Sequence, residues 1–128
     1  MSKNTPYQFV LDVLNDSPIA ARLRTRHMFG SLAIYVDEKI VFLLRSKQGV
    51  TGRDDGIWIA TKAECIGSLK QEFPALRPIE LFPARSKTGF SNWLNLPRDE
   101  EGFEEAALKA CQLVINLDPR IGRIPNVK

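Results

Sequence analysis

The sequence predicts an α+β domain in which an antiparallel sheet is covered by helices on one side. Two apolar runs, 31–36 and 39–45, are separated only by Asp37 and Glu38, a spacing typical of an antiparallel hairpin. Residues 9–14 and 103–115 repeat apolar side chains at three- and four-residue steps, as amphipathic helices do. We therefore expect helices and an antiparallel sheet to share one core.

The first element expected is a helix near the N-terminus. Thr5 is a suitable cap, Pro6 suits the first turn, and Gln8 can reach back as in a capping box. The run Asn15-Asp16-Ser17-Pro18 ends this helix, and one further turn is expected over 19–23. The chain is then expected to extend toward Phe29.

Three strands are expected next, at 31–36, 39–45 and 56–60. The nearly continuous apolar content of the first two predicts burial on much of both faces of the sheet. A second helix is expected from Thr61, where Thr61-Lys-Ala-Glu64 matches a capping box, to about Glu72.

The C-terminal half is expected to add two strands, at 79–82 and 90–96, and then the longest helix, capped by Asp99. The side chains predicted to face the core from this helix are Phe103, Ala106, Ala107, Ala110, Cys111, Val114 and Ile115. Residues 118–128 are expected to form a short basic tail. The predicted order is α-βββ-α-ββ-α, with a five-stranded sheet.

Composition limits the function classes. The 128 residues, 44% of them hydrophobic, suffice for one core, so we expect a single domain over 1–128. No apolar run approaches the roughly 20 residues that span a bilayer, and the N-terminus lacks an apolar signal core. We therefore expect a cytoplasmic protein without membrane contact. Cys65 and Cys111 are far apart and there is one histidine, so no metal site or cofactor is expected, and both thiols should be free.

The run Arg26-His27-Met28-Phe29-Gly30 resembles the Arg-x-Met-Phe-Gly signature of the TfoX N-terminal domain family, which is more distantly related to the MmcQ/YjbR group. Gly56 to Thr61 and Trp93 to Pro97 resemble later elements of that family. The signature positions are Arg26, Met28, Phe29, Gly30 and Tyr35, the last where the family usually has an aromatic residue.

The resemblance implies a two-layer α/β sandwich similar to type III secretion chaperones. It implies a domain without catalytic activity, of unassigned role, that acts by protein contacts in regulation, as competence and transcription regulators of this type do. The similarity to secretion chaperones also implies a homodimer.

A nucleic-acid-binding module is the main alternative. Arg22, Arg24 and Arg26 alternate with other residues, so in an extended segment their side chains would share one face. Together with Lys47 and Arg53 they could contact phosphates. A net charge of +3 predicts only weak binding of this kind.

Other functional interpretations are weaker. An enzyme built on His27 lacks a motif that supplies a nucleophile or an acid and base pair, so no catalytic residue is assigned. Trp58 and Trp93 could stack on bases, but burial in the core is favoured. The loops 46–55 and 83–92 carry Lys47, Arg53, Arg85 and Lys87 without a phosphate-binding fingerprint; whether these loops bind a ligand stays open.

Overall fold

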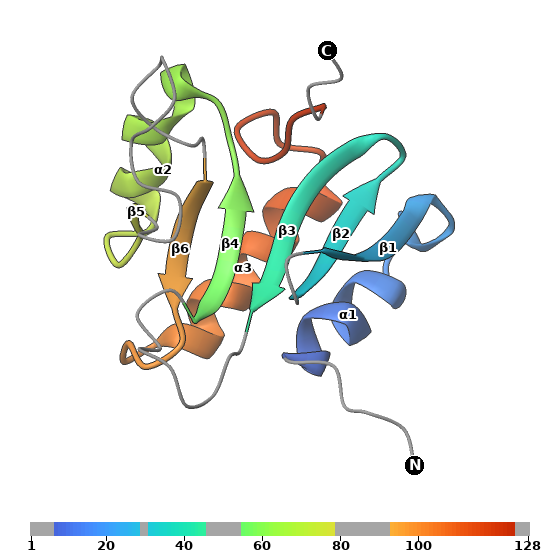
Figure 1. The fold of residues 1–128 in the computed structure, drawn as a ribbon, viewed down its shortest axis with the longest axis horizontal. Coiled ribbons are helices and arrows are strands. Elements are labelled where there is room, and N and C mark those ends of the chain that lie inside the picture. Colours follow the sequence, from blue (N-terminus) through green and yellow to red (C-terminus); the bar gives the residue numbers. More distant parts are fainter. Residues whose placement is uncertain (1–6, 29–30, 46–54, 79–92, 125–128) are drawn as a thin grey trace.

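The computed structural model describes residues 7–28, 31–45, 55–78 and 93–124, and Figure 1 shows their arrangement. The elements, in chain order, are α1 (Gln8–Asn15), η1 (Ala20–Arg22), β1 (Leu23–Met28), β2 (Ser31–Val36), β3 (Lys39–Arg45), β4 (Gly56–Ala60), η2 (Ala63–Cys65), α2 (Ile66–Glu72), β5 (Arg77–Pro78), β6 (Trp93–Pro97) and α3 (Phe103–Ile115).

The α+β class and the antiparallel sheet are confirmed. The strands lie in the order β1-β2-β3-β4-β6-β5, and every neighbouring pair is antiparallel. β1 adds a strand to those expected, because the extended segment before Phe29 pairs with β2 along its whole length. The strand expected at 79–82 lies outside the described residues.

The two faces of the sheet pack differently. The larger core cluster joins side chains from α1, α2 and α3 to one face, including Phe42, Ile57 and Ile59, which are at most 1% exposed. The opposite face carries a second cluster without helical residues, in which Trp58 packs against Trp93. Strand alternation explains the division, because Trp58 points to the face opposite to that of Ile57 and Ile59. In Figure 1, α3 crosses behind the sheet.

A β-bulge in β3 changes which residues reach the helices. Ile34 pairs with Phe42, whereas Tyr35 pairs with Ile40, so Val41 is the extra residue. Val41 and Phe42 consequently both belong to the core on the helix side.

The predicted helix caps are wrong. α1 begins after Tyr7, in a left-handed conformation, and the Gln8 amide donates to Asp12 instead of reaching back. Thr61 does not cap α2, which begins at Ile66 after the N-cap residue Cys65. α3 begins after Gly102, also left-handed, rather than after Asp99. Thr5 and Pro6 lie outside the described residues.

The C-terminal segment, residues 118–124, is built into the fold, although a tail was predicted there. Ile40 and Arg123 form a two-way backbone bridge at 3.0 and 3.1 Å, and the Gly122 amide donates to the Ala60 carbonyl at 2.7 Å. The segment therefore lies between the start of β3 and the end of β4. Ile121 is 2% exposed and joins the larger core.

Candidate functional site

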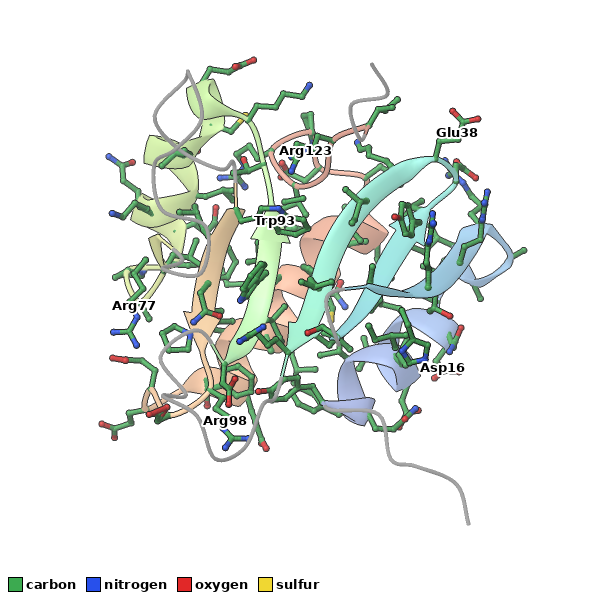
Figure 2. The ribbon with its side chains drawn as sticks, in the orientation of Figure 1. Asp16, Glu38, Arg77, Trp93, Arg98 and Arg123 are labelled. Carbon is green, nitrogen blue, oxygen red and sulfur yellow. The ribbon has the colours of Figure 1, made fainter. Side chains whose placement is uncertain are left out.

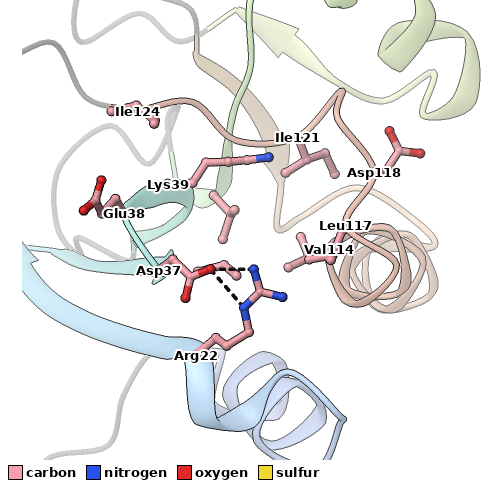
Figure 3. A pocket seen from close by; sticks show the side chains of 11 residues that line it. Arg22, Asp37, Glu38, Lys39, Val114, Leu117, Asp118, Ile121 and Ile124 are labelled. Carbon is pink, nitrogen blue, oxygen red and sulfur yellow. Dashed lines mark hydrogen bonds and ion pairs between the residues drawn. The ribbon is translucent and has the colours of Figure 1, made fainter.

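A hollow of about 400 Å³ lies beside the C-terminal end of α3 (Figure 3). The turn between β2 and β3, the end of α3 and the C-terminal segment form its walls. Its floor is apolar and consists of the buried side chains Val36, Val41, Val114 and Ile121. We call this feature the C-terminal hollow.

Exposed apolar side chains are concentrated at this hollow. Within the described ranges, three large hydrophobic side chains are exposed: Leu108, Leu117 and Ile124. Leu117, at 47% exposed, and Ile124, at 64%, both line the hollow, whereas Leu108 lies elsewhere on α3. Such a concentration distinguishes the hollow from a surface that carries scattered apolar residues.

The backbone at Leu117 is unusual. The Leu117 amide donates to the Val114 carbonyl and the Asp118 amide donates to the Leu113 carbonyl, which is the hydrogen-bond pattern of a Schellman motif. Leu117 occupies the left-handed position of this motif, with φ of 57°. Glycine usually fills that position, because a Cβ there costs about 1–2 kcal/mol.

Charges of both signs surround the hollow. Arg22 Nε donates to Asp37 Oδ2 at 2.9 Å, and this hydrogen bond holds the pKa of Asp37 below its usual value. Glu38, Lys39 and Asp118 complete the charged rim. Figure 3 shows the Arg22 guanidinium and the Lys39 side chain extending over the hollow from opposite sides.

Arg120 holds the C-terminal segment in place. Its guanidinium donates to Asp118 at 3.0 Å and pairs with Glu72 of α2 at 2.9 Å. The Thr61 hydroxyl donates to the Arg120 carbonyl at 2.9 Å. The hydrogen bonds from Arg120 lower the pKa values of Asp118 and Glu72. These contacts, which we call the Arg120 clasp, fix the wall of the hollow that Asp118 and Ile121 provide.

The predicted arginine row is divided. Arg24 and Arg26 share one face of β1, because they lie opposite Tyr35 and Ala33. Arg22 belongs instead to the 3-10 turn η1 and turns to Asp37, so the expectation that all three share a face is wrong. Lys47, Arg53, Arg85 and Lys87 lie outside the described residues.

Of the signature residues, Arg26 and Tyr35 lie on the neighbouring strands β1 and β2. Arg26 is exposed on β1, and Tyr35 is half-buried on β2 beside the second core cluster. Met28 ends β1, and Phe29 and Gly30 lie outside the described residues. His27 is exposed on the face opposite to Arg26.

The two tryptophans are buried, as favoured by the sequence. Trp58 is 0% exposed and Trp93 is 8% exposed, so neither presents a ring face for a base to stack on. Arginines lie on them instead: the Arg45 guanidinium is 5.7 Å from the Trp58 ring centre and that of Arg123 is 5.4 Å from the Trp93 ring centre. Figure 2 shows Trp93 and Arg123 in front of the sheet.

Several groups relevant to other functions are placed by the structure. Cys65 is half-buried and Cys111 buried, and both are free thiols, as predicted. Over the described ranges, no three His, Cys, Asp or Glu side chains lie close enough together to hold a metal ion. No helix in the same part of the chain is long and apolar enough to cross a membrane.

Sequence reasoning missed the C-terminal hollow. Its lining comes from η1, the β2–β3 turn, the end of α3 and the C-terminal segment, which are far apart in the sequence. One local signal was available: α3 ends at Asn116-Leu117-Asp118, without the glycine that commonly follows a helix.

Comparisons of this chain with family models, with curated proteins and with solved structures find no match.

Proposed function

We propose that this chain is a TfoX N-terminal-like domain that acts in regulation by binding another protein, without catalysis, and that the C-terminal hollow receives the partner. The observation that carries the proposal is Leu117. Its left-handed backbone conformation favours glycine, yet the residue is a leucine whose side chain is half-exposed at an apolar hollow. Local strain at an exposed apolar residue is typical of a binding site. The regulatory role rests on the resemblance of the signature at residues 26–30.

The proposed occupant is a bulky apolar side chain, leucine or aromatic, on a segment of the partner protein. The apolar floor and the volume of about 400 Å³ suit such an anchor. The rim supports a peptide rather than a nucleic acid, because phosphates would approach the carboxylates of Asp37, Glu38 and Asp118. A peptide can place charges of either sign against this rim.

Nucleic-acid binding remains the second candidate, and the pair Arg24 and Arg26 favours it. Both side chains are exposed on one face of β1. Arg22 is engaged by Asp37, so the row offers fewer phosphate contacts than the sequence indicated. Few contacts give weak binding that falls steeply with salt.

The test begins with random peptides displayed on phage and selected on the wild-type protein. We expect the enriched peptides to share a bulky apolar residue, and a labelled copy to bind in a fluorescence-anisotropy titration. Leu117→Gly should weaken this binding roughly tenfold, the effect of losing one anchor contact of about 1.4 kcal/mol. Leu108→Ala removes the exposed leucine outside the hollow and should leave the affinity unchanged.

Leu117→Gly also separates an effect on binding from an effect on folding. Glycine relieves the left-handed strain at position 117 by about 1 kcal/mol, while loss of a half-buried leucine costs about the same. The free energy of unfolding of Leu117→Gly should therefore stay within about 1 kcal/mol of wild type in urea denaturation.

Unchanged peptide affinity in Leu117→Gly would overturn the proposal. Submicromolar binding of single-stranded DNA near 0.15 M salt, lost when Arg24 and Arg26 are replaced, would favour the second candidate.

A further inference from the structure

β1 is an end strand of the sheet, and one of its edges is unpaired within the described part of the chain. The Asp37 amide donates to the Arg22 carbonyl at 2.8 Å, so residues 22 and 37 form a hydrogen-bonded pair of the antiparallel ladder. Since hydrogen-bonded and non-hydrogen-bonded pairs alternate, the backbone groups of residues 24 and 26 face β2. The amides and carbonyls of Thr25 and His27 consequently point away from the sheet, whereas the Leu23 amide closes η1 by donating to the Ala20 carbonyl.

The side chains along this edge are open to solvent and carry positive charge on one face. Arg24, Thr25, Arg26 and His27 are all exposed. Arg24 and Arg26 project from the face opposite to the helices, because Tyr35 and Ala33 lie across from them and belong to the second core cluster. Arg24 is near enough to Asp37 to contribute to the lowered pKa of that carboxyl group. No ion pair of Arg26 occurs among the described residues.

A second copy of this chain is a poor occupant for the edge. In a twofold antiparallel pair of β1 strands, outward-facing residues meet outward-facing residues, so even-numbered positions also lie opposite one another. In every register with good overlap, an arginine at 24 or 26 then faces an arginine of the other copy. Like charges directly opposite each other destabilise a strand pair. The arginines therefore discourage self-pairing, a common protection of exposed edges.

We infer that the β1 edge binds an extended, acidic segment of another protein, which adds to the sheet as a further strand. Backbone hydrogen bonds at Thr25 and His27 supply the binding, and carboxylates at alternate positions of the segment lie opposite Arg24 and Arg26. Alternation is required because only every second side chain of a strand reaches that face. This contact is separate from the C-terminal hollow, and either could hold without the other.

The charge requirement is tested with a short peptide in which Glu alternates with Val, capped at both ends and labelled for fluorescence anisotropy. A peptide of the same composition with its glutamates adjacent is the control. We expect the alternating peptide to bind at least several-fold more tightly. The double variant Arg24→Gln with Arg26→Gln should bind it roughly tenfold more weakly. Lys62→Gln with Lys70→Gln removes the same charge near α2 and should leave the affinity unchanged.

The backbone requirement is tested with proline. Thr25→Pro removes an amide that points outward, so it blocks the edge without removing a hydrogen bond to β2. This variant should retain the wild-type circular dichroism spectrum and lose peptide binding. A peptide methylated on alternate backbone amides supplies the same test with the unaltered protein, whether or not the proline variant folds, and should not bind.

Four outcomes would overturn the inference. They are equal binding of the two peptides, unchanged affinity in the double arginine variant, full binding by the methylated peptide, and tighter binding of single-stranded DNA than of the alternating peptide at the same salt concentration. Light scattering that reports a dimer, lost on Thr25→Pro, would show that a second copy takes the edge instead.

Discussion

At the scale of single residues, the surroundings of Cys111 decide its chemistry. The thiol lies on the buried face of α3, and burial raises its pKa to about 12. A thiol with so high a pKa stays protonated near neutral pH, and the thiolate is the form that reacts. Cys65, at the start of α2, is only half-buried. The two thiols should therefore differ in reactivity.

Alkylation measures this difference. With iodoacetamide at neutral pH, Cys65 of the native protein should be modified well before Cys111, and both should react at similar rates in urea. Peptide mapping by mass spectrometry reports each site separately. Equal native rates at the two cysteines would mean that α3 opens readily, and the core assigned to Cys111 would then be wrong.

The backbone conformation of Leu117 and the direction of the Arg22 side chain could not be predicted from the sequence. The sequence placed Cys111 and Val114 correctly, because a helical repeat determines which side chains face the core. The left-handed backbone of Leu117 depends on how α3 ends, and the turn of Arg22 toward Asp37 depends on the 3-10 turn before β1. Neither follows from a local periodicity.

At the scale of elements, two glycines differ in the space that surrounds the position of an added Cβ. Gly56 begins β4 with φ of 147°, and a Cβ there would collide with the backbone carbonyl of Leu96 in β6. Gly67 lies in α2, and nothing lies within 4 Å of the position its Cβ would take. One glycine therefore allows two strands to approach, and the other only weakens a helix.

Replacement by alanine should consequently have opposite effects on stability at the two glycines. Gly56→Ala should destabilise the fold by about 2–3 kcal/mol or more, because backbone atoms of β4 and β6 must move apart. Gly67→Ala should stabilise it by about 0.5–1 kcal/mol. Urea denaturation of both variants measures this. A neutral Gly56→Ala would contradict the close pairing of β4 with β6.

Prediction of the elements succeeded where a pattern repeats and failed at their ends. The hairpin of β2 and β3 follows from strand alternation. The caps failed because Thr61 was assigned from a local motif, whereas its hydroxyl is used by the Arg120 carbonyl, 59 residues away. Tertiary contacts of this kind compete with local capping and have no local signature.

At the scale of the whole molecule, the Arg120 clasp connects α2 to the C-terminal segment and so to the hollow. Asp118 and Glu72 have lowered pKa values because Arg120 donates hydrogen bonds to their carboxylates. A depressed folded-state pKa means that the unfolded chain binds more protons in acid. The resulting stability is present above the ordinary pKa values of 3.8 and 4.5, and is lost as the pH falls through the lower folded-state values.

Arg120→Met should remove this part of the acid dependence. We expect the variant to be less stable than wild type near neutral pH, and the difference between them to shrink as the pH falls below about 4.5, since protonation already weakens the clasp of the wild type. The midpoint of urea denaturation, measured at a series of pH values, gives the comparison. Arg77→Met removes an equal charge from an exposed position on β5 and should keep the wild-type pH profile. Because Asp118 and Ile121 line the hollow, Arg120→Met should also weaken the binding of hollow-selected peptides while leaving peptides bound at β1 unaffected. Parallel pH profiles for wild type and Arg120→Met would show that the acid-sensitive contacts lie elsewhere in the fold.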